Sequence, residues 1–88
     1  MRYPHLETVK ALDDYKLLLG YEASHNRIFD VSPYIKGSWY GKLIDIAYFK
    51  NVRVVGNTVM WADGQDLAPH ELYETSVLWS DELQKPAI

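Results

Sequence analysis

The segment WADGQDLAPHELY, residues 61–73, combines the end of a strand, a turn and the start of a helix. Asp63-Gly64 is a turn pair, because aspartate side chains bond nearby backbone amides and glycine accepts a positive φ. Pro69 fits the first position of a helix, where its missing N–H leaves no hydrogen bond unmade. The segment therefore predicts a strand that ends at Trp61, followed by a turn and a helix.

The predicted C-terminal helix covers residues 69–80, and residues 76–88 form its end and the tail. Glu71 places negative charge near the helix N-terminus, where the helix dipole favours it. Intervals of 4, 3 and 4 residues put one stripe on this helix, made of Leu72, Ser76, Trp79 and Leu83.

Three runs before residue 32 alternate with the period of two that is typical of strands. They are residues 5–12, 15–22 and 27–31, joined by short polar turns, and they predict an antiparallel meander. The middle run places four side chains on one face, namely Tyr15, Leu17, Leu19 and Tyr21.

A hairpin is predicted at residues 52–61, because Gly56-Asn57 tolerates the positive φ that two-residue turns require. Between the meander and the hairpin, residues 38–50 lack a period of two and predict short helical turns, with Ser38 and Asp45 as candidate caps. The fold class is therefore α+β, a single domain over residues 1–88 with a small antiparallel sheet of about five strands, as meander plus hairpin.

The most unusual local chemistry is the set Asp63, Asp66, His70 and Glu74, whose oxygen and imidazole groups suit a divalent cation. However, a helix that begins at Pro69 breaks the spacing of four that would place them on one face. We expect the two aspartates to act through the turn and through helix capping, and no metal to bind. The two aspartates belong to a motif that we expect to form the turn and the start of the helix. Its residues are Trp61, Asp63, Gly64, Asp66, Pro69 and Tyr73.

Signals of catalysis are weak throughout the chain. There is no cysteine, the three histidines stand alone, and no serine lies in a nucleophile-elbow pattern. There is no glycine-rich phosphate loop. We therefore expect no enzyme activity and no cofactor. A small-ligand or metal-binding domain, or a minor enzyme, using the Asp63–Glu74 region is the alternative.

Charge is unevenly distributed along the chain. Residues 1–53 hold eight Lys or Arg and six Asp or Glu, a net of +2, whereas residues 54–88 hold one Lys and six Asp or Glu, a net of −5. The overall charge of −3 gives no general attraction to nucleic acid. The lack of cysteine, of a long apolar run and of an apolar signal-peptide core predicts a cytoplasmic protein that does not enter a membrane.

The predicted C-terminal helix supplies a candidate interaction surface. An apolar strip with an acidic border is typical of subunit interfaces, and a two-fold dimer would use the same patch on both copies. We expect a homodimer, and an acidic face open to a basic protein partner. The residues of this surface are Trp79, Leu83, Glu71 and Glu74.

Four segments in order resemble the small bacterial domain-of-unknown-function 2442 family: LDDYKL (12–17), RIFDV (27–31), FKNVRV (49–54) and VMWADGQDLAPHELY (59–73). The likeness covers about residues 5–75 and is most specific in the Trp-x-Asp-Gly-x-Asp-Leu-x-Pro segment. It implies a small α+β domain with an antiparallel sheet and no established enzyme activity.

The resemblance also bears on partners. Some members of that family are encoded beside small basic ribonuclease-like toxins and are treated as antitoxins. Other members carry a helix-turn-helix DNA-binding domain after this one, but only about 15 residues follow the likeness here. We therefore expect no autonomous binding to nucleic acid. The family has no agreed catalytic residues to carry over, so the leading hypothesis is a non-enzymatic protein-interaction domain.

Overall fold

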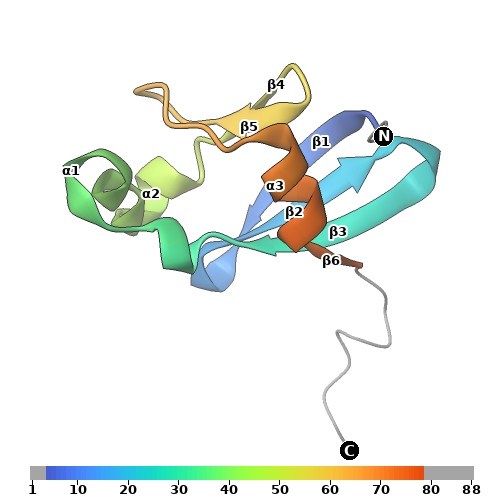
Figure 1. Ribbon diagram of the computed structural model, residues 1–88. Coiled ribbons are helices and arrows are strands. Elements are labelled where there is room, and N and C mark those ends of the chain that lie inside the picture. The colour runs from blue at the N-terminus through green and yellow to red at the C-terminus, as the bar shows by residue number, and fades with distance from the viewer. Residues whose placement is uncertain (1–3, 79–88) are drawn as a thin grey trace, which may run out of the picture.

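A four-stranded antiparallel sheet forms the base of the fold, in the order β1-β2-β3-β6 (Figure 1). This computed structural model describes residues 4–78. The predicted meander is confirmed as β1 (Leu6–Leu12), β2 (Lys16–Tyr21) and β3 (His25–Asp30). A two-residue strand, β6 (Val77–Leu78), pairs with β3 at the edge of the sheet.

The turns of the meander are short 3₁₀ segments, Asp13–Tyr15 and then Glu22–Ser24, each with a kink inside it. The chain takes left-handed backbone angles in both, with φ of 64° at Asp14 and 63° at Ala23. Aspartate tolerates this region better than alanine does, because its side chain can bond the local backbone. These tight turns join strands that pair in register, apart from a shift between Leu6 and Thr8 in β1.

The segment from Gly37 to Phe49 forms short helical turns, as predicted, and the structure divides them into three pieces. Helix α1 (Gly37–Tyr40) leads into a 3₁₀ turn (Gly41–Ile44) and then helix α2 (Ile46–Phe49). The cap at Asp45 is confirmed, since its Oδ1 accepts from the Ala47 amide at 3.0 Å. The cap at Ser38 is wrong, because the helix already begins at Gly37 and Lys36 takes the cap position without a side-chain bond.

The predicted hairpin is confirmed as β4 (Arg53–Val55) and β5 (Thr58–Met60), with Gly56 at φ 61° in its turn. It forms a separate two-stranded sheet instead of joining the meander. The side chain of Asn57 makes the link between the two sheets. Its Oδ1 accepts from the Leu6 amide at 2.6 Å, and its Nδ2 donates to the Pro4 carbonyl at 3.2 Å.

Helix α3 (Pro69–Thr75) begins at the predicted proline but is shorter than the predicted 69–80. Ser76 is extended, with ψ 161°, and the chain then pairs with β3. The stripe predicted on the helix through Leu72 and Ser76 therefore ends, because the helix itself ends before Ser76. Pairing of Val77 with Ile28 supplies long-range bonds that the local spacing does not reveal.

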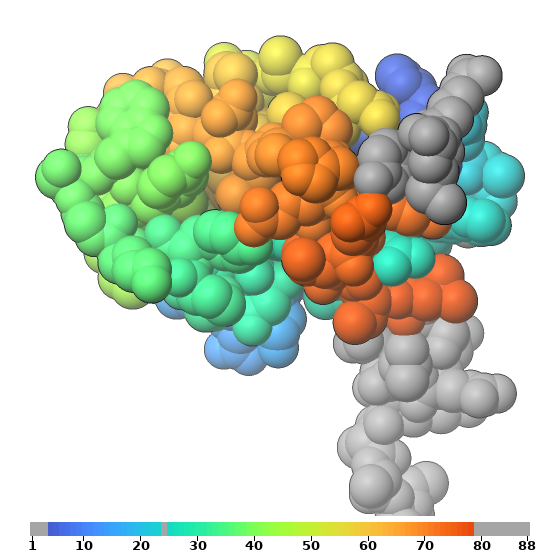
Figure 2. All heavy atoms as spheres, viewed as in Figure 1, coloured from blue at the N-terminus to red at the C-terminus, as the bar shows by residue number. Residues whose placement is uncertain are grey.

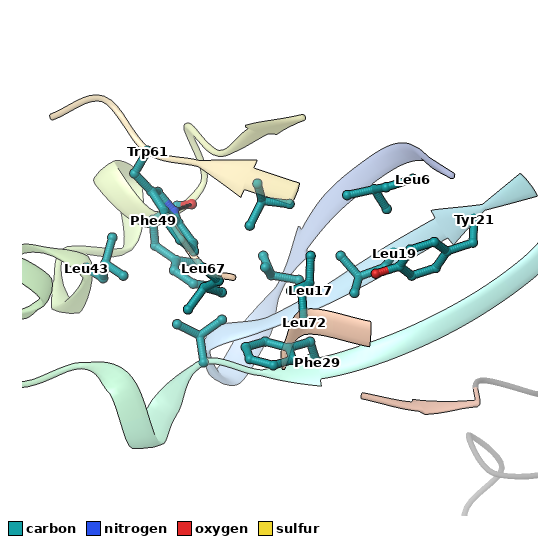
Figure 3. Packing of buried hydrophobic residues seen from close by; sticks show 12 residues of the cluster. Leu6, Leu17, Leu19, Tyr21, Phe29, Leu43, Phe49, Trp61, Leu67 and Leu72 are labelled. Atoms are coloured by element: carbon teal, nitrogen blue, oxygen red, sulfur yellow. Dashed lines mark hydrogen bonds between the residues drawn. The ribbon is translucent and has the colours of Figure 1, made fainter. Parts of the chain in front are cut away.

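One hydrophobic core lies between the four-stranded sheet on one side and α3, the hairpin and the helical segment on the other (Figure 3). The predicted inward face of β2 is confirmed, because Leu17, Leu19 and Tyr21 are buried. Phe49 and Trp61 stack with ring centroids 5.9 Å apart and join the helical segment to the hairpin. The buried members are Leu6, Leu17, Leu19, Tyr21, Phe29, Val31, Leu43, Phe49, Val59, Trp61, Leu67 and Leu72.

Candidate functional site

The loop after Trp61 is closed by its own backbone. The Trp61 amide donates to the Gln65 carbonyl at 2.9 Å, and the Gly64 amide donates to the Trp61 carbonyl at 3.0 Å. Gly64 has φ 95°, a conformation that side chains rarely adopt. The turn predicted at Asp63-Gly64 is therefore confirmed. Its positive φ explains why glycine occupies the second position.

A buried amide joins this loop to the helical segment. The side chain of Gln65 is fully buried, and both of its ends are bonded. Its Oε1 accepts from the Tyr48 hydroxyl at 2.9 Å, and its Nε2 donates to the Trp39 carbonyl at 2.9 Å. The Tyr48 hydroxyl also accepts from the Asp63 amide at 3.0 Å. These bonds satisfy groups that would otherwise be buried at a cost.

Trp61 itself is used for packing. Its indole is buried, and Nε1 donates to the Phe49 carbonyl at 2.9 Å. That carbonyl lies at the end of α2, where helix carbonyls lack partners within the helix. Trp61 thus contributes a large apolar surface to the core and satisfies one end of a helix.

Asp63 forms an ion pair at the surface. Its Oδ2 lies 2.6 Å from Nζ of Lys42, in the 3₁₀ turn of the helical segment. The hydrogen bond from Lys42 lowers the pKa of Asp63, and the same bond raises the pKa of Lys42. Both groups are well exposed, so solvent screening leaves the pair a small part in stability.

The capping role predicted for Asp66 is wrong. Helix α3 has Ala68 at its cap position, with no side-chain bond to the helix amides. The residue before a proline is held in extended conformation, so the helix cannot begin before Pro69 and Asp66 lies too far away. Asp66 contributes its backbone instead, in a bridge to Met60 and as acceptor from the Tyr40 hydroxyl at 2.8 Å.

The structure does not gather Asp63, Asp66, His70 and Glu74 into a metal-binding group. Within residues 4–78, no three His, Cys, Asp or Glu side chains lie close enough together to hold an ion. Asp63 faces Lys42, whereas His70 and Glu74 are exposed on α3.

Two of the residues predicted for the interaction surface, Glu71 and Glu74, lie on helix α3 (Figure 2, orange to red). Glu71 accepts a hydrogen bond from the Tyr34 hydroxyl, and this bond is the main cause of a raised pKa at Tyr34. Glu74 is exposed. The other two residues predicted for the interaction surface, Trp79 and Leu83, lie outside the residues that the structure describes.

Arg27 holds the end of α3 against the sheet. Its Nε donates to Oγ of Ser76 at 2.6 Å, and a terminal nitrogen donates to the Ser76 carbonyl at 2.7 Å. The guanidinium lies 4.4 Å from the ring centroid of Tyr73, which meets Tyr21 edge-on at 5.1 Å. Tyr73, predicted within the motif, therefore belongs to the contact between α3 and the sheet.

Sequence reasoning missed Arg27 and Gln65. The alternation in residues 27–31 offers a signal for Arg27, because it puts this side chain on the same face as the buried Phe29. A charged group on that face has to reach a partner. For Gln65, no signal in a single sequence distinguishes a buried amide in a turn from an exposed one.

Three apolar side chains are exposed on the helical segment. Trp39 is 48% exposed, Ile44 62% and Ile46 41%. They are not members of the core, to which this segment contributes the buried side chains of Leu43 and Phe49. The Lys42–Asp63 pair joins this helical segment to the loop of residues 61–67.

Comparisons with known proteins identify a family and leave the role open. The chain matches the family model described as "Protein of unknown function (DUF2442)" over residues 6–77. No curated protein and no solved structure matches it. None of the helices formed by the described residues has the length and apolarity needed to cross a membrane.

Proposed function

The chain belongs to the DUF2442 family, and we propose that it is a non-enzymatic protein-interaction domain that binds a basic protein. The finer form of the proposal is an antitoxin-like role, with a small basic ribonuclease-like toxin as the partner. The observation that carries the proposal is the charge of the C-terminal part. Residues 54–78 hold four acidic residues and no Lys or Arg, so their net charge is 0 − 4 = −4.

The arrangement of the motif supports binding through surfaces and not through a pocket at residues 61–73. The Gln65 amide, the Asp63 carboxylate and the Asp66 carbonyl are engaged by Tyr48, Lys42 and Tyr40. Because these polar groups bond to other parts of the same chain, their presence in the motif is explained by their role in folding.

The exposed surface has the two components that a protein interface uses. The acidic residues of α3 can attract a basic partner and guide its orientation. Trp39 and Ile44 supply exposed apolar area in the same molecule, and large aromatic side chains are frequent in the energetic centre of interfaces. Exposed acidic and apolar side chains of this kind fit a partner protein better than they fit a small ligand.

Co-expression with each neighbouring reading frame tests the proposal. We expect a short, basic protein to co-purify with the chain and to be released as salt concentration rises, because screening weakens attraction between opposite charges. The Glu74→Lys variant should bind that protein about tenfold more weakly. The matched control is Glu7→Lys, which makes the same change at an exposed position in β1.

Two results would overturn this function. One is that no basic neighbour binds the chain. The other is that Glu7→Lys and Glu74→Lys weaken binding equally, since the effect would then come from net charge and not from α3. Neighbouring genes for metabolic enzymes, together with a small molecule that raises the melting temperature, would favour the ligand-binding alternative.

A further inference from the structure

The outer face of the four-stranded sheet, opposite the core, carries an apolar row across the strands. The register places Lys10 of β1 beside Leu18 of β2, Leu18 beside Ile28 of β3, and Ile28 beside Val77 of β6. Leu18 and Ile28 are half-buried and Val77 is 59% exposed. The apolar centre of this row therefore spans three strands.

No other described element covers this outer face. The buried core cluster and the apolar residues packed against it include neither Leu18 nor Ile28. Helix α3 and the β4–β5 hairpin lie on the same side of the sheet (Figure 1). The smallest dimension of the molecule is 18 Å, which suits a sheet and one covering layer, because packed layers lie about 10 Å apart.

Opposite charges lie side by side next to the apolar row. Lys16 of β2 pairs in register with Asp30 of β3, and both project to the outer face because their neighbours Leu17 and Phe29 point into the core. One carboxylate oxygen of Asp30 accepts from the Ser32 amide at 3.0 Å, which fixes the side chain at the end of the strand. The outer face thus carries a positive group on β2 and a negative group on β3 at the same position along the two strands.

This pattern is complementary to itself. A two-fold axis that runs parallel to the strands, between β2 and β3 and just above the outer face, superimposes β2 of one copy on β3 of the other. It places Lys16 against the partner's Asp30 and Leu18 against the partner's Ile28. Each contact occurs twice, as in every isologous interface. Face-to-face packing of two sheets with nearly aligned strands is a common arrangement.

We propose that the outer face of the β1-β2-β3-β6 sheet is the contact surface of a homodimer, in which Leu18 and Ile28 form the centre and Lys16 pairs with the partner's Asp30. This surface differs from the one predicted from sequence around Trp79. It is also separate from the acidic side of α3, so dimerisation and binding of a basic protein can succeed or fail independently.

The size of the face sets the expected affinity. The strands have 7, 6, 6 and 2 residues, and with about 3.3 Å per residue and about 4.8 Å between strands they give a face of about 330 Å² per copy. The total of about 670 Å² is below the range of stable complexes, which begins near 1,200 Å². We expect a dissociation constant of about 10 to 100 µM.

Sedimentation equilibrium of the full chain, from about 5 to about 500 µM, brackets that range. We expect the wild type to change from monomer to dimer across it. Lys16→Asp and Asp30→Lys should each raise the dissociation constant about tenfold or more, since two like-charge pairs replace two attractive ones. Leu18→Ser should have a comparable effect through lost apolar contact. The control is Ile44→Ser, an exposed apolar residue on the helical segment.

Mixing the two charge variants gives the sharpest result. Each alone brings like charges together across the interface, but one copy of each places opposite charges at both contacts. An equimolar mixture should therefore dimerise at wild-type affinity or better. The pairing of Lys16 with Asp30 inside one chain cannot produce this rescue, because each variant keeps its own internal mismatch in the mixture. Circular dichroism of each variant at low concentration checks that the monomer is folded.

Three outcomes would overturn the proposal. The first is a wild type that stays monomeric throughout, as it would if another segment of the chain or a different protein covered the face. The second is a dimer that the single charge variants leave unchanged, or that Ile44→Ser weakens as much as Leu18→Ser does. The third is a mixture of folded charge variants that remains monomeric.

Discussion

Two buried polar side chains have opposite environments in this fold. The Gln65 amide is bonded at both ends, to Tyr48 and to Trp39. The Tyr21 hydroxyl is buried too, but among the described residues it has no hydrogen-bond partner. A paired buried group is costly to delete, whereas an unpaired one costs stability for as long as it is present.

The Gln65→Ala variant should lose about 2 to 3 kcal/mol of unfolding free energy, because the Trp39 carbonyl and the Tyr48 hydroxyl lose their partner in a buried place. The matched control is Asp66→Ala, next in sequence, whose side chain does not cap α3. It should change stability by less than about 0.5 kcal/mol. Urea denaturation of the two variants measures the difference, and equal losses would show that the amide has no special role.

Tyr21→Phe should leave stability at neutral pH unchanged or raise it by up to about 1 kcal/mol, since it removes a buried hydroxyl without a partner. Tyr40→Phe, which removes the donor to the Asp66 carbonyl, should instead cost about 1 kcal/mol. Unfolding free energies from urea titrations compare the two. A clear loss in Tyr21→Phe would mean that the hydroxyl has a bonding partner in solution.

Alkaline pH provides a second test of Tyr21. Burial raises the pKa of this tyrosine from 10.0 to about 12. The unfolded chain therefore releases the proton first as pH rises, and the stability that depends on the neutral phenol is present below pH 10 and lost between pH 10 and pH 12. Tyr21→Phe should lose less stability over that interval than the wild type does. Parallel loss in the two proteins would contradict the burial argument.

At the scale of elements, the side chain of Asn57 fastens the β4–β5 hairpin to the start of β1. It bonds the Leu6 amide and the Pro4 carbonyl, as a neighbouring strand would. The hairpin in turn carries the segment that leads to Trp61. Loss of this fastening should therefore loosen one sheet relative to the other.

We expect Asn57→Ala to cost about 1 to 2 kcal/mol, since two hydrogen bonds to the backbone are lost and the Leu6 amide is left without its partner. Asn51→Ala is the control, because it makes the same substitution at an exposed turn position. Amide hydrogen exchange in the Asn57 variant should also show faster exchange at Leu6. Equal stability of the two variants would remove Asn57 from this role.

Local pattern was enough to predict most elements. The period of two in residues 15–22 identified the buried face of β2, and Gly56 and Pro69 identified a turn and a helix start, because each of these features depends on the residue's own geometry. The candidate site was less predictable. The end of α3 depends on Arg27 and on pairing with β3, which are distant in sequence, and the burial of Gln65 depends on a segment that begins 28 residues earlier, at Gly37.

At the scale of the whole molecule, one core joins the two sheets, and the segment of residues 61–73 runs through the junction. Trp61, Leu67 and Leu72 all belong to that core. The polar groups between them bind the helical segment. This segment therefore serves the architecture of the domain, and we propose that binding uses the outer surfaces.

The melting temperature in the presence of divalent ions tests this central claim most directly. A ligand that binds only the folded state at a hundred times its dissociation constant adds about 2.7 kcal/mol, which in a domain of this size raises the melting temperature by about 10 °C or more. We predict that micromolar Mg²⁺, Ca²⁺, Mn²⁺ or Zn²⁺ leaves the melting temperature unchanged, and that a chelator does the same. A rise of several degrees with any of these ions, abolished by Asp63→Asn or Asp66→Asn, would contradict the claim and make the segment a binding site.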